Sequence, residues 1–156
     1  MLMLLFAIDD DRYALESQQV VEVLPLTKLT KPHQAPAYVS GLLHYRGHMV
    51  PVVDLCQLIR HRPCRAYLST RIIVARFSGA DGETQVLGLL AERVTQTFNA
   101  ADTTLIASGM VVDAAPFLGN KLLDNQGIIQ CLHVDHLLLP AQISAASFST
   151  DLPVVQ

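Results

Sequence analysis

The sequence contains an internal repeat, and this repeat limits the possible folds more than any other feature. Five similar segments follow one another in the same order in residues 2–59 and in residues 71–138. Ala14 corresponds to Gly88 and Val20 to Val94, and Val52 corresponds to Cys131 in the last pair of segments. A repeat of this kind indicates one structural unit that is built twice.

Each copy has the pattern of a small β-structure. It consists of about five short runs rich in Val, Ile, Leu and aromatic residues, separated by turn signals. Arg46-Gly47 predicts a hairpin turn, because glycine adopts positive φ readily. No segment has the periodicity of a helix of three turns. Closing each copy into a barrel removes most exposed strand edges, so we expect an all-β fold of two five-stranded barrels that share a core.

The repeat also sets the expected domain boundaries. The first barrel is expected mainly in residues 2–59 and the second mainly in residues 71–138, with 60–70 as the crossover between them. Together they form one domain over residues 1–139. After this domain the composition changes to Pro, Ala, Gln and Ser, so we expect residues 140–156 to be a flexible tail.

Composition excludes several classes of protein. The 156 residues are 51% hydrophobic and 16% charged, with a net charge of −3, whereas nucleic-acid binding normally needs a basic excess. The apolar start lacks a basic region and a cleavage site, and Asp9-Asp10-Asp11 follows it directly. No apolar run is long enough to span a bilayer. We therefore expect a cytoplasmic protein with no nucleic acid and no direct membrane insertion.

Residues that carry metal or catalytic chemistry show no convergent pattern. The 3 cysteines are odd in number and lack CxxC spacing, which disfavours a disulfide framework or a zinc site and fits a reducing compartment. Motifs of known nucleophiles, phosphate loops and metalloproteases are absent from the sequence. We expect no catalytic residues, no cofactor and no metal. The histidines, read as surface or half-buried imidazoles rather than ligands, are His33, His44, His48, His61, His133 and His136.

The densest basic stretch lies in the crossover. It contains Arg60, Arg62, Arg65 and Arg71, with His61 among them. Such a run is typical of a solvated connecting loop. A phosphate site is the alternative interpretation.

Residues 35–55 carry a family resemblance. They read APAYVSGLLHYRGHMVPVVDL. This resembles the signature of the CheW-like family of bacterial chemotaxis coupling proteins, which has a Pro-Ala-aromatic stretch, a glycine, Asn-Leu-Arg-Gly, and a Pro-containing strand that ends in Asp-Leu. Residues 70–74 and 86–90 add support, and the resemblance covers about residues 2–139.

The resemblance implies a fold and two partners. The fold is two SH3-like five-stranded β-barrels packed together, with a hydrophobic groove between them. The partners are the regulatory domain of a CheA-type histidine kinase, itself CheW-like, and the cytoplasmic tip of a methyl-accepting chemoreceptor. The implied function is a non-enzymatic adaptor that couples the receptor to the kinase.

One departure from the signature favours a subgroup. Where Asn-Leu-Arg-Gly is usual, this chain has His44-Tyr45-Arg46-Gly47. With Leu68-Ser69-Thr70-Arg71-Ile72, this form resembles coupling proteins of Wsp-type systems, which control cyclic-di-GMP output in surface sensing. A Wsp-type or twitching-motility pathway is therefore the alternative function. A small-barrel oligonucleotide-binding protein is a more distant one, since such barrels often bind RNA or DNA.

Matching family positions gives the expected receptor and kinase contacts. Val20 and Glu22 are expected on one face of a strand, as an apolar strip with a charge at its edge that suits a receptor helix. Arg46 can meet a carboxylate either on a partner or within the barrel. For each valine, packing in the core is the competing interpretation. The full set of expected contacts is Val20, Glu22, Val23, Arg46, Gly47, Leu87 and Val94.

Overall fold

The computed structural model describes residues 1–78, 82–106 and 117–137. These residues form strands joined by short turns and one short α-helix. The predicted tail at 140–156 lies outside the described residues. In chain order the elements are β1 (Leu2–Ile8), β2 (Asp11–Glu16), η1 (Ser17–Gln19), β3 (Val20–Pro25), β4 (Val39–Tyr45), β5 (His48–Asp54), α1 (Leu55–Arg60), β6 (Arg71–Ser78), β7 (Thr84–Ala91), β8 (Gln96–Asn99), η2 (Ala100–Asp102), β9 (Thr104–Ile106), β10 (Leu118–Asp124), β11 (Gly127–Leu132) and η3 (Val134–His136).

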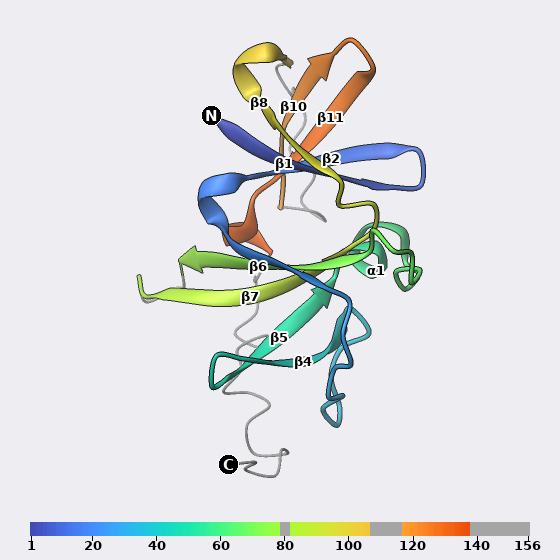
Figure 1. Cartoon of the computed structure of the whole chain (residues 1–156), viewed down its shortest axis with the longest axis vertical. Helices are drawn as coiled ribbons and strands as arrows, with labels where there is room; N and C mark the ends of the chain where they lie inside the picture. The colour runs from blue at the N-terminus through green and yellow to red at the C-terminus, as the bar shows by residue number, and fades with distance from the viewer. Residues whose placement is uncertain (79–81, 107–116, 138–156) are drawn as a thin grey trace.

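The strands form two sheets, as the all-β prediction requires. One sheet has six strands in the order β8-β1-β2-β11-β10-β9, and the other has five in the order β3-β6-β7-β5-β4. In Figure 1 the six-stranded sheet occupies the upper part of the molecule, and β4 and β5 lie in the lower part. Strands β6 and β7 cross the middle, between β1–β2 above and β4–β5 below.

The sheets correct the predicted boundaries of the two barrels. Strands β1 and β2 belong to the first copy but join β8–β11 of the second copy, while β6 and β7 join β3–β5. The joining pairs are parallel, β2 with β11 and β5 with β7. The first hairpin of each copy is therefore part of the sheet formed by the rest of the other copy. Barrels drawn as 2–59 and 71–138 were wrong in this respect.

The register of these parallel pairs reproduces the repeat. Ala14 pairs with Cys131 in one sheet, and Gly88 pairs with Val52 in the other. Ala14 and Gly88 occupy equivalent positions of the two copies, and so do Val52 and Cys131. A Cβ atom on Gly88 would lie 2.8 Å from Cγ2 of Val52. The glycine therefore lets the branched side chain of Val52 approach the neighbouring strand.

The exchange explains why the hairpin strands are apolar on both faces. In β1, Met3 and Leu5 pack into a small cluster within the six-stranded sheet, while Leu4, Phe6 and Ile8 pack into the largest cluster. Strand β6 is alike: its odd-numbered apolar residues face the largest cluster, and its even-numbered ones face a cluster of the five-stranded sheet. Side chains alternate between faces along a strand. The largest cluster is thus a core shared by the two sheets, as expected.

The turns and the helix follow local sequence signals. Arg46 and Gly47 have φ values of 48° and 80° between paired Tyr45 and His48, so the predicted hairpin turn is confirmed with positive φ at both central residues. Asp54 begins α1, because its Oδ1 accepts the backbone N–H of Gln57 at 3.1 Å. Among the described residues, no helix has the length and apolar character to cross a membrane.

A bidentate ion pair ties together two hairpins of the six-stranded sheet. Arg12 of β2 donates from Nη1 and Nη2 to the two carboxylate oxygens of Asp124, at 2.8 and 2.6 Å. Asp124 also accepts the backbone N–H of Gln126 at 2.8 Å in the β10–β11 turn. The hydrogen bonds from Arg12, assisted by its charge and by backbone donors, lower the pKa of Asp124 to about 2.

Because of this ion pair, we expect part of the free energy of unfolding to be lost at acidic pH. Because the pKa of Asp124 in the folded state is below the value of about 3.9 expected for an unfolded aspartate, the pair stabilises the fold above about pH 4. This contribution is lost as the pH falls through about 2. Urea midpoints measured across this range should therefore fall less steeply for Asp124→Asn than for the natural protein. Parallel curves for the two proteins would contradict the assignment.

Candidate protein-binding site

Strand β3 is the part of the five-stranded sheet most open to a partner. It lies at one edge of the sheet, hydrogen-bonded only to β6 among the described strands. Five of its six residues are half-buried, and none is fully buried. Leu26, immediately after the strand, is 41% exposed. A half-buried apolar strand with one free edge is a surface that another chain can cover.

A polar cluster joins β3 to the β4–β5 turn. The hydroxyl of Tyr45 donates to Oε2 of Glu22 at 2.5 Å, and Nη2 of Arg46 approaches the same oxygen at 3.3 Å. The guanidinium of Arg46 also lies over the Tyr45 ring, 5.0 Å from its centre. The hydrogen bond to Glu22, together with burial and the carboxylate charge, raises the pKa of Tyr45. The tyrosine hydroxyl thus remains a donor at neutral pH.

Arg46 is held at this site without being enclosed by it. Its side chain is 70% exposed, and that of Glu22 is 40% exposed. The contact between them uses one nitrogen and one oxygen, so the internal carboxylate does not occupy the whole guanidinium. An exposed pair of this kind contributes little to stability. The remaining donors of Arg46 are free to form a bidentate pair with a carboxylate of another molecule.

The structure brings together only part of the expected contact set. Glu22, Arg46 and Gly47 lie at the polar cluster, and Val20 and Val23 are half-buried on the same strand as Glu22. Leu87 and Val94 belong to the core, with exposures of 0% and 2%. These two offer no surface to a partner, so their assignment as contacts is corrected to core packing.

A β-bulge also corrects the expected face of β3. The register against β6 shifts between Val20 and Glu22. Val20 packs with Val23 against the shared core, whereas Glu22 contacts Tyr45, which packs against the cluster of the five-stranded sheet. Val20 and Glu22 therefore do not form the single strip that strict alternation predicts. The neighbour of Glu22 is instead Tyr45, which the sequence analysis did not single out as a contact.

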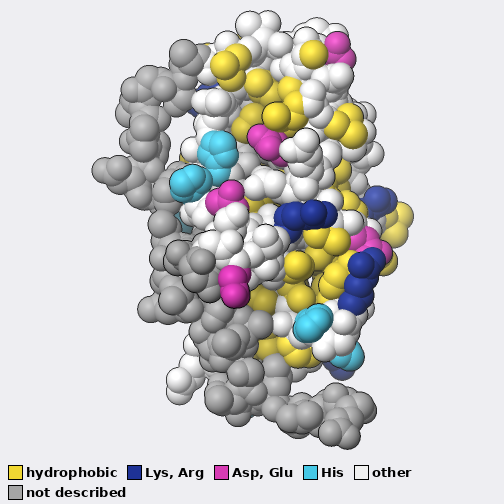
Figure 2. Space-filling model, turned by 90° about the vertical axis from the view of Figure 1, so that its left-hand side faces the viewer, with side chains coloured by type: hydrophobic (Ala, Val, Ile, Leu, Met, Phe, Trp, Pro, Cys, Tyr) yellow, Lys and Arg dark blue, Asp and Glu magenta, His cyan; other side chains and the backbone are white. Residues whose placement is uncertain are grey.

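The side of the molecule that carries this cluster is mixed in character. Figure 2 views the molecule from the side to which the β4–β5 turn points in Figure 1. Hydrophobic side chains are open to solvent there, among side chains of Lys, Arg, His, Asp and Glu. Apolar area bordered by charges is the usual anatomy of a protein-binding surface.

A hollow separate from the β3 surface lies between α1 and the six-stranded sheet. It is a hollow of about 570 Å³ between α1 with the residue that follows it and strands β2, β10 and β11. None of the seven expected contact residues lines it. Its lining is apolar with a few charged groups, and consists of Asp11, Arg12, Tyr13, Leu58, Ile59, His61, Phe117, Leu118, Lys121, Ile128 and Gln130. The three strands that line it all belong to the six-stranded sheet, so the hollow lies between that sheet and α1.

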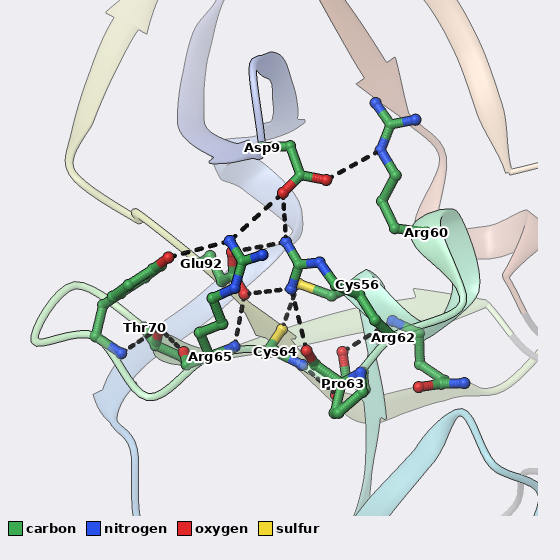
Figure 3. Close-up of polar contacts among 12 residues, drawn as sticks. Asp9, Cys56, Arg60, Arg62, Pro63, Cys64, Arg65, Thr70 and Glu92 are labelled. Carbon is green, nitrogen blue, oxygen red and sulfur yellow. Dashed lines mark hydrogen bonds and ion pairs between the residues drawn. The ribbon is translucent and has the colours of Figure 1, made fainter.

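The connection that carries the basic stretch is largely exposed, as predicted for a connecting loop, but Arg60, Arg62 and Arg65 also take part in an ion-pair network (Figure 3). Arg62 donates from Nη1 to Oε2 of Glu92 at 2.9 Å and from Nη2 to Oδ1 of Asp9 at 2.7 Å. The backbone N–H of Arg65 donates to Glu92 at 2.6 Å, and Arg60 pairs with Asp9 and Asp11. These carboxylates neutralise Arg60, Arg62 and Arg65, which disfavours the alternative phosphate site.

Glu92 is the central acceptor of this network. It is 1% exposed at the end of β7. Burial alone would raise its pKa, but the hydrogen bonds from Arg62 and from the Arg65 backbone, with the charge of Arg62, keep the pKa below its usual value.

One group of side chains in the described residues has the composition of a metal site. Ligand atoms of Asp54, Cys56 and Cys64 lie within 4.8 Å of one another. Both oxygens of Asp54 already accept backbone N–H groups, from Gln57 and from Cys64. The six histidines do not join this group.

Comparison with known proteins gives the family. Residues 2–141 match the family model described as CheW-like domain. The "Probable chemotaxis protein CheW" of Rhizobium etli is 28% identical over 97 residues, which are 62% of this chain and 59% of that protein. "Protein FrzA" of Myxococcus xanthus is 32% identical over 89 residues, which are 57% of this chain and 52% of that protein. The matches thus span a little over half the length of these curated relatives.

A solved structure supports the fold separately. The scaffolding protein TtCheW from Thermoanaerobacter tengcongensis superposes with a TM-score of 0.73 at 20% identity. The match covers 90% of this chain and 88% of TtCheW. It confirms the fold of two SH3-like β-subdomains. Since the family model extends over nearly all of the described residues, the chain belongs to the CheW-like family.

Proposed function

We propose that this chain is a non-enzymatic adaptor that couples methyl-accepting chemoreceptors to a CheA-type histidine kinase in the cytoplasm. Membership of the CheW-like family supports the general role. The observation that carries the proposal is the edge strand β3, half-buried along its length and joined to an exposed arginine through Glu22 and Tyr45. This unit has the features of a protein-binding surface and no reactive group.

The receptor is the partner that fits this surface. A receptor tip consists of helices, and a helix can lay an apolar face against the half-buried valines of β3. A carboxylate at the edge of that face would meet the free donors of Arg46. The hollow beside α1 shares no residue with this surface, and we assign the regulatory domain of the kinase to it in this proposal. An adaptor needs two such surfaces that can be occupied together.

Coupling then depends on unequal binding of receptor states. If β3 and Arg46 bind one receptor conformation more tightly than another, binding of the kinase at the same time transmits that difference. Modest interfaces, smaller than those of permanent complexes, keep such an assembly reversible. Many weak contacts in an array then act together.

The replacement Arg46→Ala tests this proposal. We expect the dissociation constant for the receptor tip to rise about tenfold or more, as is usual when an arginine at the centre of an interface is truncated. The melting temperature should change little, because the side chain is 70% exposed. Binding to the regulatory domain of the kinase should persist. Calorimetric titration with each purified partner measures both affinities.

Arg93→Ala is the matched control. Arg93 is also exposed, also has positive φ (50°), and also lies over a tyrosine ring, 5.5 Å from the centre of Tyr67. It lies outside the proposed surface, so its replacement should leave receptor affinity unchanged. Equal losses for the two variants, or a large fall in melting temperature for Arg46→Ala alone, would contradict the proposed role.

A further inference from the structure

Two cysteines from different segments meet beside the ion-pair network. Cys56 is the second residue of α1 and is fully buried, whereas Cys64 lies in the connection to β6 and is partly buried. They are eight positions apart in the chain, and their Sγ atoms are 2.6 Å apart. Figure 3 shows the two side chains pointing toward each other. Bonded sulfurs are about 2.05 Å apart, so only a small movement separates this pair from a bond.

One carboxylate anchors both the first turn of α1, which contains Cys56, and the backbone of Cys64. Oδ1 of Asp54 accepts the N–H of Gln57 in the first turn of α1 at 3.1 Å, and Oδ2 accepts the N–H of Cys64 at 3.0 Å. Arg62, which lies between the two cysteines in sequence, is fixed by Glu92 and Asp9. The approach of the two thiols is therefore a property of a well-anchored segment.

We propose that Cys56 and Cys64 form a reversible disulfide that links the connection 61–70 covalently to α1. The proposed oxidant is a low-molecular-weight disulfide such as oxidised glutathione. The Cys64 thiolate, which is the more accessible, attacks one sulfur of this disulfide and releases one thiol. Cys56, having lost its proton, then attacks the Cys64 sulfur and releases the second thiol. The two cysteines lose two electrons and two protons, and the oxidant becomes two thiols.

The surroundings of Cys64 favour a slow and pH-dependent reaction. The hydrogen bond that it donates to Cys56, its burial and the nearby carboxylate of Asp54 all raise the pKa of the Cys64 thiol. Thiolate is the attacking species in thiol–disulfide exchange, so the rate should rise with pH through the alkaline range. In a reducing compartment, such a bond is formed transiently, which is the usual behaviour of cytosolic redox-responsive cysteines.

A metal ion fits the same side chains less well. Two thiolates on a tetrahedral zinc ion, each at about 2.3 Å, are roughly 3.7 Å apart. The sulfurs here are 2.6 Å apart and would have to separate. Both oxygens of Asp54 are also engaged by backbone N–H groups. Zinc is therefore an outcome that the experiment must detect.

Thiol trapping on the full chain tests the proposal. The reduced protein is incubated with oxidised glutathione at mildly alkaline pH, remaining thiols are alkylated under denaturing conditions, and intact mass and peptide maps are recorded. We expect two of the three cysteines to escape alkylation, and the peptide map to show one disulfide, between Cys56 and Cys64. Dithiothreitol should restore all three alkylated thiols. The urea midpoint of the oxidised form should be higher than that of the reduced form.

Single replacements make the result specific. Cys131→Ser should still form the linkage, because Cys131 is not part of the pair. Cys64→Ser should abolish it and leave Cys56 able to react with alkylating agent after denaturation, with an unchanged circular dichroism spectrum as the check of folding. Full alkylation of Cys56 and Cys64 after oxidation, a linkage to Cys131 or between two chains, or one equivalent of tightly bound zinc would each overturn the proposal.

Discussion

Replacing Glu92 with alanine is expected to lower the free energy of unfolding by about 3 kcal/mol, the lower end of the cost for a buried ion pair, because its partner Arg62 is 24% exposed. The carboxylate is 1% exposed and accepts hydrogen bonds from Arg62 at 2.9 and 3.2 Å. It also accepts the backbone N–H of Arg65 at 2.6 Å. Its loss leaves that N–H unpaired and leaves Arg62 with Asp9 as its main partner. Urea unfolding followed by circular dichroism measures the change.

Glu22→Ala is the matched control for this prediction. Glu22 is also a carboxylate paired with an arginine, but its side chain is 40% exposed. Its removal should change stability far less, because water replaces the lost contacts. Glu92→Gln should fall between the two, since the amide oxygen still accepts one hydrogen bond. Equal effects of Glu22→Ala and Glu92→Ala would mean that the buried network does not stabilise the fold.

The sequence predicted the local structure well because local signals act over a few residues. Gly47 and its neighbour Arg46 specify a two-residue turn, and the apolar runs specify strands. The short helix α1, which begins after the N-cap Asp54, is consistent with the absence of any three-turn helical pattern. The repeat identified Ala14 and Gly88 as equivalent residues, and the structure places them at equivalent positions of the two parallel pairs, although the sequence did not predict those pairs.

The exchange of hairpins could not be read from the same signals. When two copies are alike, the β1–β2 hairpin can pair with the edge strand of either copy and bury the same side chains. In the structure both faces of β1 are buried. Leu5 packs in the small cluster of the six-stranded sheet, and Phe6 packs in the core between the two sheets. Apolar residues at consecutive positions report this burial, but they do not report which sheet lies on each side.

The candidate site shows the same limit. A core valine and a contact valine look alike in the sequence, so Val94 could not be separated from Val20 before its 2% exposure was known. The bulge between Val20 and Glu22 shifts the face of the strand by one residue. Pairing of Arg62 with Glu92 joins positions 30 residues apart, and only the fold brings them together.

The shared core predicts a second large effect, from the replacement Phe6→Ala. Phe6 is fully buried in the core between the sheets and stacks on Tyr13, with ring centres 5.5 Å apart. Removing a buried phenylalanine leaves a cavity and typically costs about 3–5 kcal/mol. Because side chains of both sheets line this core, we expect amides of β5 and of β11 to lose hydrogen-exchange protection together. Mass spectrometry of exchange in urea measures both strands at once.

Phe98→Ala separates this effect from a loss confined to one sheet. Phe98 lies half-buried on the edge strand β8 and packs against the small cluster of the six-stranded sheet. Its removal should cost less, and should reduce protection mainly in β11 and its neighbours. If Phe6→Ala instead leaves β5 protected while β11 unfolds, the two sheets have independent cores. The hairpin exchange would then join the sheets through the chain alone, without coupling their stabilities.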